Sequence, residues 1–293
     1  MTSRVCNSAT KRSCRRGAGV LIALLAAMAG PAFAASGSGG ESRVIADEWV
    51  LNVGGFLTDF NTTAAAGTGN AIGTVISLED ELGLEDDKSF LRSDGHYRFN
   101  PRHAIGFGYW GLKRTGERII TGQIDWDGNT YDVGVALNTD FNIDWLRVDW
   151  RYSFLRTDRG EAGVNIGLSS YNLEVALDGT GTINGMMNTR VRAEETLFAP
   201  VPTFGMFVNF AVTPNVLFRG AFNWLDLEVG DIEGEVTDVL LVFEWYFTEH
   251  FGIGGGASRT SIDYTDTSED PLTLDYSQSG FLAYLTFAWG DVD

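Results

Sequence analysis

The chain has 293 residues, of which 39 are Asp or Glu and 21 are Lys or Arg, giving a formal net charge of −18. This acidic balance argues against nucleic acid as a partner, because such binding needs a basic face. Both cysteines, Cys6 and Cys14, lie in the first 34 residues, so the rest of the chain has neither a disulfide framework nor thiolate chemistry.

The first 34 residues predict a cleaved secretory signal peptide. A basic start without acids is followed by the apolar run AGVLIALLAAMAG at 18–30 and by PAFA at 31–34. This order is typical of a secretory leader, and we expect cleavage after Ala34. A retained membrane anchor is the alternative, although 13 apolar residues are short for a bilayer span. Cleavage would leave a mature charge of 16 − 39 = −23 and a short periplasmic segment at 35–47 before the main domain at 48–293.

The stretch VDWRYSFL at 148–155 shows the alternation of a β-strand. Large apolar side chains at the even positions alternate with Asp149, Arg151 and Ser153. Successive strand side chains point to opposite faces, so one face is apolar and the other is charged. In a soluble sheet the apolar face would pack in the core, whereas in a membrane barrel it would face lipid. Because the secretory leader is followed by no long apolar helix, we expect the barrel.

The same alternation recurs along the chain and predicts an all-β protein, an antiparallel transmembrane β-barrel. Ten strands fit the pattern best, with eight or twelve as alternatives. We expect the strands at 48–60, 88–99, 103–116, 138–156, 161–176, 200–212, 215–228, 235–247, 251–263 and 278–290.

The connections between these strands differ in length at the two ends of the barrel. Short turns rich in Pro, Asn or charged residues are expected at 100–103, 156–161, 213–215 and 248–250. Long acidic loops are expected near 61–87, 115–135, 178–199, 229–236 and 263–277. Short turns on the periplasmic side and long extracellular loops are typical of an outer-membrane barrel.

Aromatic residues supply a second indication of membrane insertion. Seven of them fall on the apolar face near a short turn or near the C-terminus, where they would form a ring at one lipid–water interface. The predicted interface aromatics are Phe99, Phe154, Phe210, Phe218, Phe247, Phe251 and Trp289.

Charged residues opposite the apolar face would point into the barrel, because an Arg facing lipid at the midplane costs about 2–4 kcal/mol. Two interpretations follow: a salt-bridged plug that fills the lumen, which we favour, or a narrow selective pore. The predicted lumen charge network consists of Arg92, Asp94, His96, Arg98, Arg147, Asp149, Arg151, Arg219 and Glu244.

The signal peptide, the alternating strands, the turn asymmetry and the aromatic final strand FLAYLTFAW at 281–289 resemble the small outer-membrane β-barrel proteins of Gram-negative bacteria, in the broad group of OmpA-like and OmpW-like barrels. The resemblance covers nearly all of 48–290 and rests on the overall pattern rather than on a specific motif. Such barrels usually end in an aromatic residue, whereas here the last aromatic residue, Trp289, lies four residues before the end. It implies a place in the cell envelope, contact with outer-membrane lipid and lipopolysaccharide, and insertion by the outer-membrane assembly machinery. The sequence leaves the oligomeric state open.

No catalytic constellation is found, so we expect no enzyme, no cofactor and no metal. A barrel phospholipase or protease would need a His near the outer rim, but His103 and His250 fall at short turns and His96 falls in the lower half of the interior. The expected function is structural or a narrow porin-like passage for small solutes, with surface recognition or adhesion through the acidic loops as the alternative. Those loops are interpreted as solvated surface rather than as a cation site; their acids are Glu79, Asp80, Glu81, Glu85, Asp86, Asp87, Asp263, Asp266, Glu269, Asp270 and Asp275.

Overall fold

The computed structural model describes residues 47–69 and 71–291; the predicted signal peptide and most of the predicted 35–47 segment lie outside this part of the chain. The described residues form an all-β structure with ten long strands, which confirms the predicted class and strand number. The long strands are β1 (Asp47–Ala66), β3 (Asp87–Asn100), β4 (His103–Ile119), β7 (Ala136–Thr157), β8 (Gly160–Ile183), β9 (Met186–Thr213), β10 (Val216–Val229), β11 (Ile232–Tyr246), β12 (Phe251–Asp266) and β13 (Leu272–Asp291).

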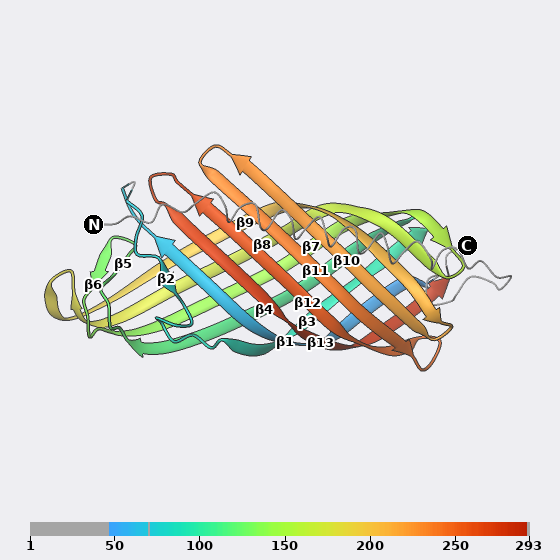
Figure 1. The fold of residues 1–293 in the computed structure, drawn as a ribbon, viewed down its shortest axis with the longest axis horizontal. Helices are drawn as coiled ribbons and strands as arrows, with labels where there is room; N and C mark the ends of the chain where they lie inside the picture. Colours follow the sequence, from blue (N-terminus) through green and yellow to red (C-terminus); the bar gives the residue numbers. More distant parts are fainter. Residues whose placement is uncertain (1–46, 70, 292–293) are drawn as a thin grey trace, which may run out of the picture.

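These ten strands close into a ring by antiparallel pairing of chain neighbours. The first strand pairs with the last along its whole length, from Asp47 opposite Asp291 to Ala66 opposite Leu272. The β8–β9 ladder completes the ring on the other side. Figure 1 shows the strands inclined to the long axis of the molecule, as barrel closure requires. Within the described residues, no helix is long and apolar enough to cross a bilayer.

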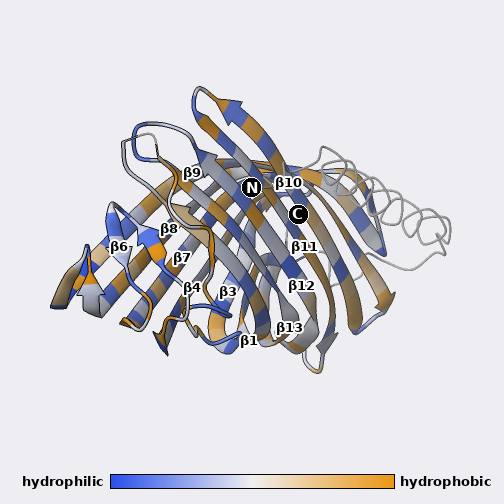
Figure 2. Cartoon of the chain, turned by 60° about the vertical axis from the view of Figure 1, so that its left-hand side comes forward, coloured by the Kyte–Doolittle hydropathy of each residue, from blue (hydrophilic) through white to orange (hydrophobic). Residues whose placement is uncertain are grey.

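Hydrophobic and hydrophilic residues alternate along the strands (Figure 2). On β11, Leu241, Phe243 and Trp245 are exposed, whereas Val242 and Glu244 between them are buried. On β7, Val148 and Trp150 are exposed and Asp149 is buried. The exterior is therefore apolar and the interior polar in the half of the barrel near the short turns, which is the inside-out distribution of a membrane barrel.

Three of the predicted long loops are extended β-hairpins, which corrects the sequence analysis. The predicted 178–199 loop is strand up to Ile183 and again from Met186, with a turn of Asn184 and Gly185 between them. Both turn residues have positive φ, 52° and 74°. Asn-Gly is the favoured pair for such a hairpin turn, because both residues tolerate this backbone conformation. The predicted loops at 229–236 and 263–277 are likewise short turns between longer strands, at 230–231 and 267–271.

The turns that follow β3, β7, β9 and β11 lie at one end of the barrel and are here called the short turns. The connection between β1 and β3 folds inward over the opposite end, here called the extracellular end. It carries the two-residue strand β2 (Ile76–Ser77), paired with β1. Its Leu78, Leu82 and Leu84 are buried together with Phe60 and Trp110 in one apolar cluster. The prediction that this acidic segment is a solvated loop is therefore wrong for its leucines, because the acids alternate with apolar side chains that fill the barrel end.

The connection between β4 and β7 adds a further small hairpin at the same end. Its strands are β5 (Ile124–Trp126) and β6 (Asn129–Tyr131). Trp126 and Tyr131 are fully buried in the same apolar cluster as the leucines of the β1–β3 connection. The extracellular half of the lumen is consequently packed mainly with hydrophobic side chains, and most of the buried charged residues lie in the other half.

Candidate functional site

The lumen charge network predicted from the sequence lies inside the barrel in its lower half, toward the short turns. Eight of its nine residues are buried, and the side chain of the ninth, Arg151, is 16% exposed. Strand parity places these residues on the inner face: Arg92, Arg147, Asp149, Arg151 and Glu244 each follow an exposed apolar residue. The network spans β3, β7, β10 and β11, so four strands contribute to it.

Each carboxylate in the wall of β3 and β7 is shared between two arginines. Asp149 Oδ2 lies 2.8 Å from Nε of Arg151, and its Oδ1 lies 3.0 Å from Nε of Arg147. Asp94 lies 3.6 Å from Nε of Arg92 and also accepts a hydrogen bond from Asn52 at 3.0 Å. Sharing one negative charge between two guanidinium groups offsets part of the cost of burying them.

One ion pair crosses the lumen. Arg219 on β10 reaches Asp94 on β3 at 3.8 Å, and these two strands lie five positions apart in the ring of ten. Arg219 also donates a hydrogen bond to Glu244 on β11 at 2.6 Å. Side chains from opposite walls therefore meet at the centre of the barrel, which closes the lumen at this level.

A second crossing pair involves Glu161, which the sequence analysis left out. Its side chain is 2% exposed and accepts two hydrogen bonds from Arg98 at 2.9 and 3.0 Å and one from Asn209 at 2.7 Å. Glu161 stands at the junction of the predicted turn 156–161 and the predicted strand 161–176, and in the structure it begins the polar inner face of β8 that continues with Asn165 and Ser169. That alternation was the signal that could have identified it.

The extracellular half contains one buried cation, Arg114, which the sequence analysis also missed. Its side chain is fully buried and donates a hydrogen bond at 2.6 Å to Glu79, from the acidic β1–β3 connection. The guanidinium carbon lies 4.5 Å from the ring of Phe60 and 4.6 Å from that of Phe141. This ion pair, enclosed by aromatic faces, anchors the inward-folded connection to β4.

The predicted interface aromatics lie on the outer face, near the short turns or the end of β13. Five of the seven are 43–55% exposed, and Phe210 and Phe218 are half-buried against neighbouring strands. Phe218 packs beside Phe243, and Phe251 beside Phe287, with ring centroids 5.2 and 5.5 Å apart.

Above the apolar exterior, four carboxylates stand side by side on neighbouring strands. We name Asp226, Glu235, Asp263 and Asp275 the acidic row: each is the register partner of the next, from β10 to β13. Burial and the adjacent charges of Asp275 and Glu235 raise the pKa of Asp263.

The barrel wall is interrupted between β9 and β10. Their ladder ends at Phe204 opposite Trp224, although β9 continues toward the extracellular end along β8 and β10 along β11. Pro202 and Pro200 come directly beyond the last pair on β9. Proline has no N–H to give to a ladder and is found on strand edges. In Figure 1 the β10–β11 hairpin leans away from β8 and β9 above this point.

A cavity of about 340 Å³ lies at this gap, and we call it the wall-gap cavity. Its lining is apolar except at the rim, where Asp263 contributes the one charged side chain. Aliphatic and aromatic residues from β7 to β13 surround it, including Leu173, Phe198, Leu225 and Leu274. The volume falls in the range of small-molecule sites.

No known family model matches the chain, and no curated protein is similar to it in sequence. Among solved structures, the outer membrane protease OmpT from Escherichia coli aligns with a TM-score of 0.51 and 9% identity, covering 82% of this chain and 97% of OmpT. The outer membrane protein OprG from Pseudomonas aeruginosa aligns with a TM-score of 0.40 and 9% identity, covering 85% of this chain and 98% of OprG. Identities this low bear on the fold alone. The assignment of the fold rests on the alignment with OmpT, together with the ring of strands and its apolar exterior.

The chain has the fold of a Gram-negative outer-membrane β-barrel. This confirms the resemblance inferred from alternation and turn asymmetry, and the inward charged face follows from it. In this outer-membrane β-barrel, His103 and His250 lie at the short-turn end, and His96 is buried in the lower lumen.

Proposed function

We propose that this outer-membrane β-barrel is a closed, non-enzymatic barrel that admits a small apolar molecule from the outer leaflet through the gap between β9 and β10. The observation that carries the proposal is the wall-gap cavity, which is apolar and lies where the wall is interrupted. The gap begins at Phe204 and Trp224, just below Asp226 of the acidic row, so an apolar ligand would enter it at the outer edge of the bilayer and remove its apolar surface from water on binding.

The closed lumen supports this role over that of an open pore. The lower half is crossed by the Arg219–Asp94 and Arg98–Glu161 pairs, and the upper half is packed with apolar side chains. We therefore expect purified protein in planar bilayers to give no stepwise conductance above the lipid background. Reproducible single-channel steps from the wild-type protein would favour the narrow pore instead.

Binding is tested with the fluorescent apolar probe N-phenylnaphthylamine and the protein in phosphatidylcholine nanodiscs, with empty nanodiscs as the blank. Ala199 lines the wall-gap cavity, and Ala199→Trp would fill it. We expect saturable probe binding to the wild-type protein and at least a tenfold loss in this variant. Ala257→Trp is the matched control, because Ala257 is exposed on the outer face of β12. Equal binding by both variants would refute the proposed site.

A second candidate function, surface recognition, is favoured by the acidic row. Four register-paired carboxylates present a strong negative potential at the extracellular end. If this surface recognises a cationic partner, polylysine should bind the wild-type protein at low ionic strength and be released by salt. A variant with the four acids replaced by Asn or Gln would then bind no polylysine.

A further inference from the structure

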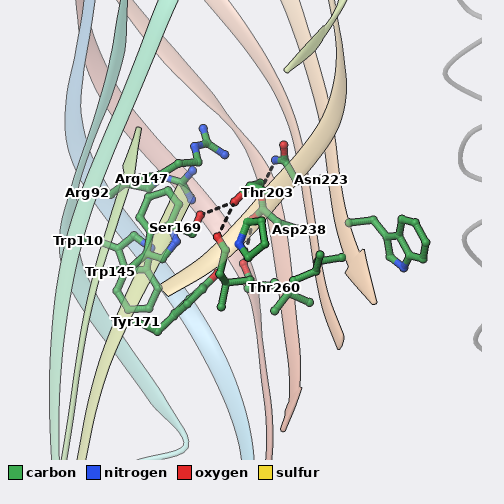
Figure 3. A pocket seen from close by; sticks show the side chains of 15 residues that line it. Arg92, Trp110, Trp145, Arg147, Ser169, Tyr171, Thr203, Asn223, Asp238 and Thr260 are labelled. Atoms are coloured by element: carbon green, nitrogen blue, oxygen red, sulfur yellow. Dashed lines mark hydrogen bonds between the residues drawn. The ribbon is translucent and has the colours of Figure 1, made fainter. Parts of the chain in front are cut away.

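The wall-gap cavity adjoins a second cavity, whose lining includes several polar and charged side chains. This smaller cavity has a volume of about 20 Å³, and Tyr171, Val201, Leu225 and Val236 line both. Its inner end is formed by residues of β3, β4 and β7. Figure 3 shows Arg92 and Arg147 there, on the same side as Trp110 and Trp145, with Ser169 and Thr203 nearby.

Arg92 and Arg147, which both line the small cavity, each have one buried donor that forms no hydrogen bond among the described residues. They are 6% and 8% exposed, and the Nε of each is buried without a hydrogen-bond partner among the described residues. Their charges are balanced only by contacts with Asp94 at 3.6 Å and Asp149 at 3.0 Å, neither of which forms a hydrogen bond to them. A buried donor left unpaired costs about 1–3 kcal/mol, and more when it is charged.

Trp145 holds both guanidinium groups in place. Its ring lies 5.7 Å from the guanidinium carbon of Arg92 and 5.3 Å from that of Arg147. The two groups therefore converge on the cavity from one aromatic support. A guanidinium fixed in this way is preorganised for the planar, two-oxygen geometry of a carboxylate.

Asp238, the other charged residue that lines the small cavity, already has hydrogen-bond partners. Asp238 accepts hydrogen bonds from Asn223 at 3.1 Å and from Thr260 at 3.0 Å. It therefore has less need of a ligand than the arginines do. A cavity of about 20 Å³ exceeds the minimum for one water but is small, so a carboxylate suits it better than a phosphate.

We propose that the site binds amphipathic carboxylates, with the apolar chain in the wall-gap cavity and the carboxylate against Arg92 and Arg147. The inference rests on the proposed function, since it names the ligand class of the same site. The apolar chain supplies most of the buried area, and the head group supplies specificity, because other heads would leave the Nε donors of both guanidinium groups without a hydrogen bond.

The test uses three ligands with the same ten-carbon chain: decanoate, decanol and decyltrimethylammonium. Each displaces N-phenylnaphthylamine from the full-length protein in phosphatidylcholine nanodiscs, after correction for partitioning into empty nanodiscs. We expect decanoate to displace the probe at a concentration at least tenfold lower than either of the others. This comparison needs no variant, so it stands even if substitutions in the lumen impair folding.

The double variant Arg92→Gln/Arg147→Gln tests the head-group contact. We expect it to lose the tenfold preference for decanoate while it still binds decanol, whereas Arg102→Gln, at an exposed turn position, keeps the preference. If decanoate and decanol bind alike in the wild-type protein, the carboxylate inference is wrong but the apolar site stands. If decyltrimethylammonium binds best, the inference is overturned and Asp263 at the rim becomes the anchor. If none displaces the probe and Ala199→Trp changes nothing, the proposed function itself fails.

Discussion

Glu244 is the residue at which the closed lumen can be tested most directly. It is 1% exposed, and its Oε1 lies 2.6 Å from Nη1 of Arg219 and 2.7 Å from the hydroxyl of Tyr284. Its Oε2 accepts a hydrogen bond from Tyr246 at 3.1 Å. Replacing Glu244 by Leu would leave the buried Arg219 with the more distant Asp94 as its remaining anionic contact.

Removing one partner of a buried ion pair costs about 3–5 kcal/mol. Because Arg219 keeps its 3.8 Å contact with Asp94, we expect Glu244→Leu to lower the free energy of unfolding by about 3 kcal/mol, at the lower end of that range. Arg219→Met alone should cost a similar amount, since it leaves Glu244 buried and charged. Replacing both partners by apolar side chains is often close to neutral, so the double variant should cost less than either single one.

The assay is equilibrium urea unfolding of the protein in lipid vesicles, followed by tryptophan fluorescence. A folded barrel in an unheated sample runs at a different mobility on a gel from the same sample after boiling. The loss of that unheated band gives an independent measure of the folded barrel. The expected coupling energy between the two substitutions is about 2–3 kcal/mol. A cost below about 1 kcal/mol for Glu244→Leu, or simple additivity in the double variant, would show that the pair is hydrated and that the lumen is not closed at this level.

Three further predictions concern the wall. A Cβ atom at Gly254 would clash with the ring of Tyr284, so Gly254→Val should lower the free energy of unfolding in urea by about 1–3 kcal/mol. A Cβ atom at Gly255 would meet only a backbone oxygen at 3.5 Å, so Gly255→Val should leave stability unchanged. The double variant Pro200→Thr/Pro202→Thr restores two backbone N–H groups, which should let β9 pair further with β10. We expect N-phenylnaphthylamine to bind this variant severalfold more weakly. Unaltered affinity would mean that the prolines do not maintain the gap. Because the pKa of Asp263 is raised, the folded state holds this proton more tightly than the unfolded chain and loses stability as pH rises through the raised pKa. Asp263→Asn should therefore stabilise the protein by roughly 0.5 kcal/mol at pH 7 and reduce the loss of stability that occurs as pH rises above the ordinary pKa of an aspartate. A destabilised variant would contradict this sign.

Local alternation was sufficient to determine the architecture. The period of two assigns Val148 and Trp150 to lipid and Asp149 and Arg151 to the lumen without knowledge of any partner strand, because an inverted face would expose charges to lipid. The Asn-Gly pair at 184–185 is equally visible in the sequence, but the polar composition of 178–199 by itself suggests a loop. Hairpins that extend beyond the membrane have no apolar outer face, so composition does not distinguish them from loops.

Tertiary structure alone decided which charges meet and where the wall opens. Glu161 and Arg98 lie 63 positions apart in the chain, and their pairing depends on the diameter and stagger of the closed ring, which no local pattern encodes. The inward fold of the β1–β3 connection depends on the space above the lumen network. The gap beside Pro202 arises because β9 and β10 stop pairing at Phe204 and Trp224 while each continues along its other neighbour, and the proposed ligand site follows from that separation. The direction of a side chain follows from the local backbone, so the sequence pattern predicts it. Cavities and ion pairs depend on the distances between strands that are far apart in the sequence, so only the closed barrel determines them.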